Sequence, residues 1–329
     1  MHTTNVSDPL TLAEIHAAAA ALQPRIQRTP VHSLQSAQSH REFGADTQVY
    51  LKLELLQLTG TFKVRGALLN MLHLSTQAAS RGVTAISAGN HAIAVAFAAR
   101  ELGISAKVVM IATANPLRIS LCEAYGAQIV MAANAHVGFE MVERIAREEG
   151  RALIHPFEGR TTALGTATLG LELCEQVQRL DAVIVPIGGG GLCAGVSSAI
   201  KLMNPECRVF GVEPDGADSM YRSFQAGEPR SIERVATIAD SLGAPYALPI
   251  TFQMCRRNVE SIVRVSDTQL KDAMRFLLTN AKLAVEPAGA AATAALRGPL
   301  GEELRGKRVA LIVCGSNIDA GTFAKLIAE

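Results

Sequence analysis

The stretch AVIVPIGGGGLCAG, residues 182–195, joins a short apolar run to four consecutive glycines and then to a helical pattern. A buried strand that turns through glycines into a helix is typical of parallel α/β sheets. The glycines let backbone N–H groups point into a concavity, and the helix start adds partial positive charge, so the turn predicts a phosphate site. Glu213 ends the next apolar run, near where a ribose-binding acid is expected, so a dinucleotide-binding dehydrogenase stays open here.

Apolar runs and helical patterns alternate on both sides of this stretch. The runs predict buried strands, and the Ala-rich segments between them predict helices. The expected strands are 49–55, 83–86, 107–111, 128–131, 152–154, 182–187, 209–212 and 309–313, and the expected helices include 92–102, 137–149, 192–203 and 267–280. Thr11 and Glu14 form a capping box, which predicts the start of the first helix. The chain is therefore predicted to build parallel sheets covered by helices.

The composition excludes several classes of protein. The 329 residues carry 31 Lys and Arg against 30 Asp and Glu, so no overall field attracts nucleic acid or an anionic membrane. Aromatic residues make up 4% of the chain, which argues against stacking platforms for bases. We therefore expect a small-molecule partner, with no nucleic acid and no membrane bound.

Cysteine usage and the N-terminal segment predict a compartment. The six cysteines form no CxxC pair and no Cys/His metal spacing, and scattered free thiols suit a reducing environment. The first residues include Asp8 and no apolar signal-peptide core, and apolar runs such as 92–99 are too short to span a bilayer. These features predict a cytoplasmic protein.

Three further strand-to-helix turns contain chemically useful residues. In TGTFKVRGA, Lys63 lies beside Phe62 among small residues, where lost solvation would make its amine a better nucleophile than a surface lysine. In SAGNH, small residues at a helix start suit a carboxylate, and Asn90 can both donate and accept hydrogen bonds. Cys314 ends another apolar run, where a buried structural thiol is the ordinary interpretation.

Taken together and in this order, the motifs resemble the fold type II pyridoxal-phosphate (PLP) enzymes, in particular the threonine/serine dehydratases and serine racemases. The resemblance covers essentially the whole chain. It rests on the segments 52–54, 59–67, 87–91, 155–157, 188–192, 212–214, 237–240, 286–287 and 314–319. A NAD-dependent dehydrogenase has no use for 59–67 or 87–91, so the resemblance disfavours that alternative.

The resemblance implies an α/β fold with two open parallel-sheet domains and the cofactor between them. Residues 1–68 and 158–329 would form a large PLP-binding domain, and residues 69–157 a small domain that closes over the active site. A homodimer or homotetramer is implied by the resemblance alone.

The resemblance also implies a role for each site residue. Lys63 would form the Schiff base with PLP and later remove the substrate's α-proton, Phe62 would pack on the cofactor ring, and Cys314 would face the pyridine nitrogen. Asn90 would hydrogen-bond the cofactor's 3′-oxygen. The 5′-phosphate would be held by Gly188, Gly189, Gly190, Gly191 and Leu192. The substrate carboxylate would be bound by Ser87, Gly89, Asn90 and His91.

These residue types favour α,β-elimination. A thiol with an unperturbed pKa of ~8.5 is a poor proton source for the ring nitrogen, so the neutral ring favours prompt loss of a β-leaving group. We expect a β-hydroxy amino acid such as L-threonine or L-serine to give a 2-oxo acid and ammonia. A non-catalytic binding protein on the same scaffold is the alternative from another class. The presence of Lys63 argues against it, because binding alone requires no amine nucleophile.

Departures from the family pattern discriminate among substrates. Ala88 stands where serine racemases carry a Ser that acts as a base, which disfavours racemisation. Leu164 removes an amide and Ser241 adds bulk beside the expected cofactor face, so a bulkier substrate such as phenylserine is an alternative. Gly138 falls where hydroxyaspartate-active relatives place an Arg, which counts against a β-carboxylate.

A cation site is implied by the same resemblance. Its ligands would be Glu213, the carbonyl of Ala217 and Ser219, but relatives carry an Asp at the last position. Because fewer carboxylates weaken a divalent site, we expect a weakly bound monovalent or divalent cation, or none.

Overall fold

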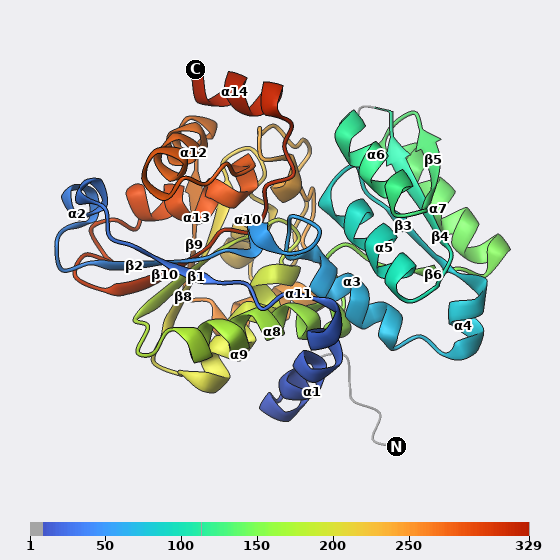
Figure 1. The fold of residues 1–329 in the computed structure, drawn as a ribbon, viewed down its shortest axis with the longest axis horizontal. Coiled ribbons are helices and arrows are strands. Elements are labelled where there is room, and N and C mark those ends of the chain that lie inside the picture. The colour runs from blue at the N-terminus through green and yellow to red at the C-terminus, as the bar shows by residue number, and fades with distance from the viewer. Residues whose placement is uncertain (1–8, 113, 329) are drawn as a thin grey trace.

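The computed structural model describes residues 9–112 and 114–328. Within them the strands form two separate sheets, which lie side by side in Figure 1. The strand order is β1-β2-β10-β7-β8-β9 in one sheet and β5-β4-β3-β6 in the other. The strands are β1 (Val31–Leu34), β2 (Gln48–Lys52), β3 (Val83–Ile86), β4 (Ala106–Ile111), β5 (Gln128–Ala132), β6 (Ala152–Leu153), β7 (Ala182–Pro186), β8 (Arg208–Pro214), β9 (Ser261–Val265) and β10 (Arg308–Ile312).

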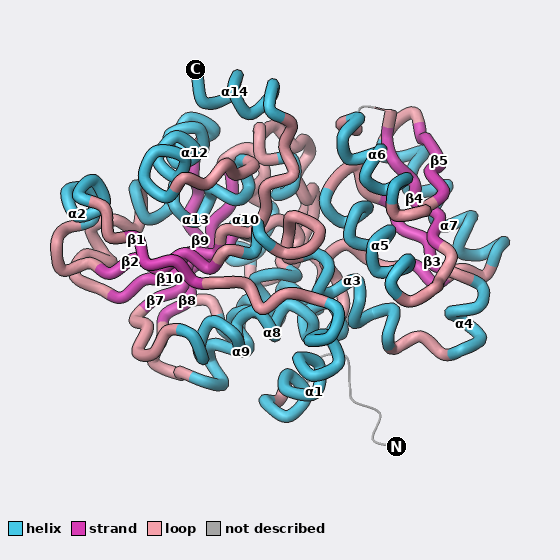
Figure 2. The backbone as a smooth tube through the Cα atoms, in the orientation of Figure 1, coloured by secondary structure: helices cyan, strands magenta, loops and turns pink. Residues whose placement is uncertain are grey.

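Helices surround both sheets (Figure 2). The α-helices are α1 (Leu12–Leu22), α2 (Ala37–Phe43), α3 (Lys63–Leu72), α4 (Thr76–Arg81), α5 (Asn90–Glu101), α6 (Pro116–Ala124), α7 (Ala135–Glu149), α8 (Arg160–Gln176), α9 (Gly191–Met203), α10 (Ser219–Ala226), α11 (Pro249–Asn258), α12 (Asp267–Ala281), α13 (Pro287–Arg297) and α14 (Ala320–Ala328). Three single 3-10 turns are η1 (Gln23–Arg25), η2 (Glu54–Leu56) and η3 (Asp240–Leu242). We call residues 76–153, with β3–β6 and α4–α7, the small unit, and the rest of the described chain the large unit.

The expected α/β alternation is confirmed. Every residue of β7 is buried, as its continuous apolar run predicts, and β7 pairs in parallel with β8 and β10. The capping box at Thr11 is present, with the Glu14 side chain returning to the Thr11 amide. Among the described residues, no helix combines the length and the apolar character needed to cross a membrane.

Two details of the large sheet differ from what the sequence predicts. β1 lies antiparallel to β2, so the large sheet has one antiparallel edge. The strand expected over 49–55 ends at Lys52, and η2 follows at once. The reason is that Glu54 turns into the interior to pair with Arg65, which bends the chain out of the sheet. The alternating pattern of 49–55 gives no sign of this bend.

The topology brings the predicted site together. β2, β10 and β7 are neighbours and run parallel, so their carboxyl ends share one edge of the sheet. Lys63, Cys314 and Gly188 follow these three strands. The segment with Asn90 follows β3 of the small unit, and the site therefore lies between the two units.

Candidate active site

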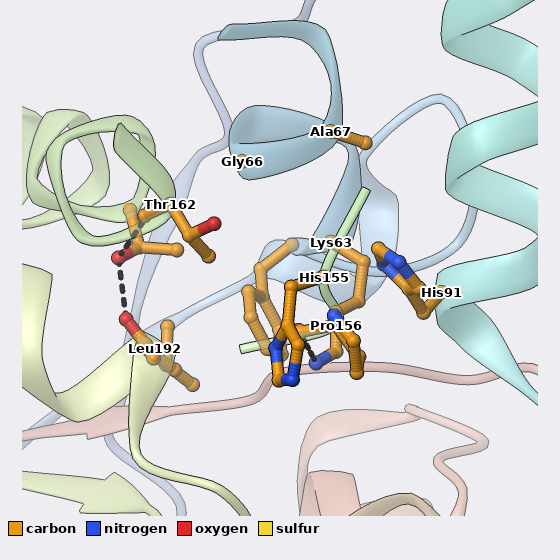
Figure 3. Close-up of a pocket in the computed structure, with 11 residues that line it drawn as sticks. Lys63, Gly66, Ala67, His91, His155, Pro156, Thr162 and Leu192 are labelled. Atoms are coloured by element: carbon orange, nitrogen blue, oxygen red, sulfur yellow. Dashed lines mark hydrogen bonds between the residues drawn. The ribbon is translucent and has the colours of Figure 1, made fainter. Parts of the chain in front are cut away.

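Lys63 is the first residue of α3, and its amine is buried in a cavity (Figure 3). The Nζ atom donates a hydrogen bond of 2.7 Å to the carbonyl oxygen of Pro156 and lies 5.2 Å from the centre of the Phe62 ring. Burial lowers the pKa of Lys63 to about 8, although the nearby Cys314 and Glu286 oppose the shift. The amine therefore loses its proton far more easily than a surface lysine, as a nucleophile or base requires.

Two histidines beside Lys63 are held neutral. Burial lowers the pKa of His91 to about 3 and that of His155 to about 4, and the charge of Lys63 adds to both shifts. One ring nitrogen of His91 bonds the Ile154 carbonyl at 2.8 Å. The Nδ1 atom of His155 accepts from the Glu158 amide at 2.9 Å. Neither ring places a competing positive charge in the cavity.

The four glycines form a tight turn into α9. Gly190 has a φ of +92°, which an L side chain rarely adopts. A Cβ on Gly189 would lie 2.1 Å from the Phe157 ring, and one on Gly191 would lie 2.5 Å from the Phe157 carbonyl oxygen. Close packing therefore requires glycine here. The backbone N–H groups of the first turn of α9 have no acceptor within the helix and can bind a ligand. The glycines can therefore serve both the close packing on Phe157 and the binding of an anion.

The Ser87–His91 segment closes the other side of the cavity. The Ser87 hydroxyl accepts a hydrogen bond from the Gly89 amide at 3.0 Å, which shapes the turn before α5. The Nδ2 atom of Asn90 donates to Glu286 at 2.7 Å and to Ser241 at 3.2 Å. The Asn90 carboxamide is thus buried and its orientation is fixed by residues of the large unit.

Cys314 lies just beyond β10 and is buried. Its Sγ atom donates to the Ala288 carbonyl at 3.4 Å. Burial raises the pKa of the thiol well above its ordinary range, and Glu286 adds to the shift. Cys314 therefore remains a neutral thiol whose proton is shared with a backbone carbonyl.

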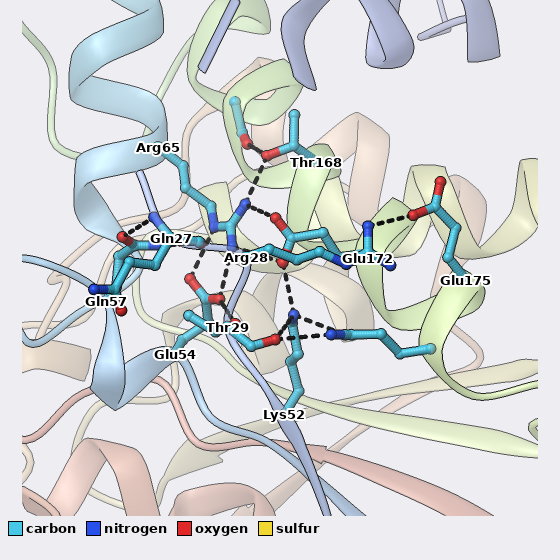
Figure 4. A network of polar contacts seen from close by, with 12 residues as sticks. Gln27, Arg28, Thr29, Lys52, Glu54, Gln57, Arg65, Thr168, Glu172 and Glu175 are labelled. Carbon is cyan, nitrogen blue, oxygen red and sulfur yellow. Dashed lines mark hydrogen bonds and ion pairs between the residues drawn. The ribbon is translucent and has the colours of Figure 1, made fainter. Parts of the chain in front are cut away.

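Behind Lys63, a buried network of charges anchors the start of α3 (Figure 4). The guanidinium of Arg65 donates two hydrogen bonds of 2.8 Å to the carboxylate of Glu54 and reaches Glu172 on α8 at 2.8 Å. Lys52 at the end of β2 donates to Glu172 at 2.7 Å. The network thus ties β2, α3 and α8 together and fixes the direction in which Lys63 leaves the helix.

A second group of polar contacts joins the two units. Arg118 on α6 donates to Asp240 of the large unit through both terminal nitrogens, and to the carbonyl of Asn317. Asn115 donates to Asp319 at 2.9 Å. Glu286 and Asp240 fall in segments that carry the family resemblance, whereas nothing in the pattern around Arg118 signals this contact. We call the Arg118–Asp240 pair the clasp.

The structure places the three departures from the family pattern, Ser241, Leu164 and Gly138, in different surroundings. Ser241 lines the cavity together with Lys63, as expected. Leu164 instead lines a groove against α1, so the expectation that it lies beside the cofactor face is wrong. A Cβ on Gly138 would lie 2.7 Å from Cδ1 of Ile86, so an apolar side chain fills the place expected of an arginine.

The cation site stays a prediction. Both carboxylate oxygens of Glu213 accept from backbone amides, at 3.0 Å from Met220 and 2.6 Å from Tyr221. The hydroxyl of Ser219 donates to the Ala244 carbonyl at 3.2 Å. Within residues 9–112 and 114–328, no three His, Cys, Asp or Glu side chains gather as a metal site would need. This donor set does not fit a tightly held divalent ion.

Known proteins resemble the chain over nearly its whole length. The family described as "Pyridoxal-phosphate dependent enzyme" matches residues 22–315. Phenylserine dehydratase of Ralstonia pickettii is 53% identical over 321 residues, which cover 97% of each chain. L-threonine ammonia-lyase of Thermotoga maritima is 38% identical over 97% of this chain and 78% of its own. The solved structure of maize serine racemase superposes with a TM-score of 0.90 at 35% identity and covers 98% of both chains.

Proposed function

The chain belongs to the pyridoxal-phosphate dependent enzymes, and from this membership we propose that it is a lyase acting on a β-hydroxy amino acid with an aromatic ring on its β-carbon, such as phenylserine. The products would be a 2-oxo acid and ammonia. The observation that carries the choice of substrate is that Gly138, at the position where the resemblance implies an arginine in hydroxyaspartate-active relatives, packs so closely on Ile86 that an added Cβ would lie 2.7 Å from its Cδ1.

The cavity fits PLP. When bound, this cofactor supplies an electron sink that stabilises negative charge on the substrate's α-carbon. Lys63 provides a desolvated amine for its attachment, and the first amides of α9 would hold its phosphate. Phe62 and the neutral thiol of Cys314 line the remaining space. Gly188 to Leu192 belong to the same lining, so each part of the predicted cofactor site opens on one cavity.

The chain's own residues supply the proton transfers. Lys63 Nζ takes the α-proton and returns it to the β-hydroxyl, which departs with its bonding electron pair as water. The pKa values of His91 and His155, about 3 and about 4, make both rings far weaker bases than Lys63, whose pKa is about 8. The backbone and side chains of Ser87 to His91 receive the substrate carboxylate. Ala88 offers only a methyl group, which holds no proton and so supports elimination over racemisation.

Two features support an uncharged β-substituent. Ile86 directly precedes the Ser87–His91 segment in the chain, and its side chain packs against the same apolar cluster as Val137 and Met141 of α7. Arg118, whose Nη1 lies 3.2 Å from a Cβ built on Gly89, is already paired with Asp240. Its guanidinium is therefore already paired, and a β-carboxylate near Gly89 would have to compete with Asp240 for it. Hydroxyaspartate is accordingly the weaker candidate.

The experiment compares three substrates on the holoenzyme. We expect kcat/KM for threo-phenylserine to exceed that for L-threonine by about tenfold or more, because burying an aromatic side chain adds roughly 1.5–3 kcal/mol. The value for 3-hydroxyaspartate should be the lowest. The variant Gly138→Arg should raise turnover of 3-hydroxyaspartate relative to phenylserine. Equal or better turnover of threonine or hydroxyaspartate by the wild type would contradict the choice of substrate.

We further propose that the enzyme is a cytoplasmic homodimer or homotetramer. The six free thiols, five of them buried, support a reducing compartment. Helix α14 leaves Phe323, Leu326 and Ile327 half-buried, which supports a contact with a second copy. Analytical ultracentrifugation tests this, and a monomer at micromolar concentration would contradict it.

A further inference from the structure

Glu286 is a buried carboxylate whose second oxygen lacks a hydrogen bond. Its side chain is 1% exposed and lines the cavity with Lys63 and Cys314. The Oε1 atom accepts from Asn90 Nδ2 at 2.7 Å. The Oε2 atom is buried and has no hydrogen-bond partner within the described part of the chain, and the nearest cation, Arg118 Nη2, is 3.7 Å away. A buried carboxylate oxygen without a hydrogen bond costs folding free energy. Its presence in the cavity is explained if the charge serves the site.

We propose that Glu286 is a positioning residue of this active site: it turns the NH2 group of Asn90 toward the cavity, and its negative charge keeps Lys63 a strong enough base to take the α-proton. The proposal rests on the assignment of Lys63 as the cofactor-binding lysine. It adds a residue to which the family resemblance gave no role.

The orientation of Asn90 follows from its neighbours. An ionised carboxylate only accepts hydrogen bonds, so Glu286 requires the Asn90 NH2 group on its side. On the opposite side, Asn317 Nδ2 donates to Asn90 Oδ1 at 2.7 Å and to the Thr59 carbonyl at 2.8 Å. Ser241, which lines the cavity, receives the other Asn90 proton. Both Asn90 protons are therefore taken in this structure, and an anionic 3′-oxygen of the cofactor would replace Ser241, at the cavity wall, as the acceptor of the second one.

The charge of Glu286 acts on Lys63. Burial lowers the pKa of Lys63, whereas Glu286 and Cys314 raise it. The other titratable groups near the amine, His91 and His155, are neutral, and Cys314 is a protonated thiol. Glu286 is therefore the carboxylate on which the remaining basicity of Lys63 depends.

The small unit helps to keep Glu286 ionised. Burial raises the pKa of Glu286 to about 7, and Arg118 opposes that rise, while Asp240 adds to it. Both Arg118 and Asn90 lie on the small unit, whereas Glu286 lies at the start of α13 in the large unit. The carboxylate thus has its cation and its amide donor only when the two units are closed, which couples closure to the base strength of Lys63.

The first test uses cofactor-free protein. The rate at which a small amine-reactive ester acylates Lys63, mapped by peptide mass spectrometry, should rise with pH through a midpoint near 8 in the wild type. In Glu286→Gln we expect this midpoint to fall. Glu42→Gln, which removes from α2 the carboxylate paired with Arg297 of α13, is the matched control and should leave the midpoint unchanged. An unshifted midpoint in Glu286→Gln would overturn the electrostatic part.

A second test separates orientation from charge. In Glu286→Gln the dissociation constant for PLP should rise about tenfold, the loss expected of one charge-assisted hydrogen bond. Asn317→Asp replaces the NH2 group that donates to Asn90 Oδ1 with a carboxylate oxygen, so two acceptors face each other, while Glu286 is unchanged. It should weaken PLP binding similarly without lowering the Lys63 midpoint. Unchanged PLP affinity in both variants would overturn the orientation part. If wild-type protein binds PLP elsewhere than Lys63, the proposed function fails instead, and the acylation midpoint still reports on Glu286.

Discussion

The reactivity of Lys63 depends on where its side chain lies. Its amine is hydrogen-bonded to the Pro156 carbonyl, and the cost of keeping a charge in this buried place lowers its pKa from 10.5 to about 8, although Glu286 opposes the shift. Sequence reasoning singled out this residue because it follows a predicted strand, beside Phe62 and among small residues, where it could lose solvation, and the family resemblance gave it its role. The two neutral histidines that flank the cavity were part of the resemblance, but their lack of charge follows only from their burial.

The pH dependence of cofactor loading tests this environment. Only the neutral amine attacks PLP, so the loading rate of cofactor-free protein should increase with pH through a midpoint near 8 and level off above it. A lysine with its ordinary pKa of 10.5 would show the midpoint more than two pH units higher. Stopped-flow absorbance at a fixed PLP concentration gives the profile. A midpoint near 10 would show that Lys63 is solvated.

The glycine loop offers a test at a single atom. In Gly189→Ala the new methyl group overlaps the Phe157 ring, so the loop must move and the dissociation constant for PLP should rise at least tenfold. Removing the ring in the double variant with Phe157→Ala should restore part of the affinity, because the two side chains compete for the same space. Titration of PLP into each cofactor-free variant checks this. If the losses of PLP affinity in Gly189→Ala and Phe157→Ala simply add up in the double variant, the overlap of the two side chains is contradicted.

At the scale of elements, β2, α3 and α8 are joined by charges rather than by apolar contacts alone. Arg65 and Glu54 are fully buried, and each satisfies the other with paired hydrogen bonds. Burial alone would raise the pKa of Glu54, but Arg65 and Lys52 lower it overall. Removing one partner leaves an uncompensated buried charge, which is far more costly than losing a surface pair.

Glu54→Gln should therefore destabilise the protein by about 3 kcal/mol, measured as the free energy of unfolding in urea. Glu302→Gln, whose side chain is 91% exposed beside Arg305, is the control and should change it by less than about 0.5 kcal/mol. Because the folded-state pKa of Glu54 lies below 4.5, its contribution is present above that pH and is lost as the pH falls through the folded value. An equal loss of unfolding free energy in Glu54→Gln and Glu302→Gln would contradict the stabilising role of the buried network.

The sequence predicted most elements because their apolar runs and helical patterns are strong. It predicted β7 and the start of α9 within one residue, since four glycines mark the turn between them. It missed β1 and β9, the two edge strands of the large sheet, and it extended β2 past Lys52. Those errors share a cause: an edge strand and a buried ion pair depend on residues distant in sequence, such as Arg65 on α3.

At the scale of the whole molecule, the site is completed only where the two units meet. The residues that follow β2, β7 and β10 could be grouped from the sequence, because parallel neighbours end at one edge. The clasp could not be predicted in this way. Arg118 lies on α6 and Asp240 lies in η3, and no spacing rule connects them. The same holds for Glu286, which belongs to a recognised segment but shows its unpaired oxygen only in the folded chain.

The clasp should tune substrate binding. Asp240 is 60% exposed and Arg118 is 8% exposed, so the pair contributes only about 0.2–1 kcal/mol toward the closed arrangement. Asp240→Asn should therefore raise KM by about two- to fivefold. Steady-state kinetics with the preferred substrate measure this, with Glu302→Gln as the control for loss of a surface charge. A KM equal to that of the wild type would show that the clasp does not favour closure.

The most direct test of the central claim is the absorption spectrum of the holoenzyme, compared with that of Lys63→Ala, before and after addition of threo-phenylserine. The account predicts a near-visible cofactor band in the wild type that shifts with substrate while the 2-oxo acid and ammonia accumulate. Lys63→Ala should lack both the shift and the products, although it keeps the glycine loop. A wild type without such a band, or a Lys63→Ala variant that turns over phenylserine normally, would contradict it.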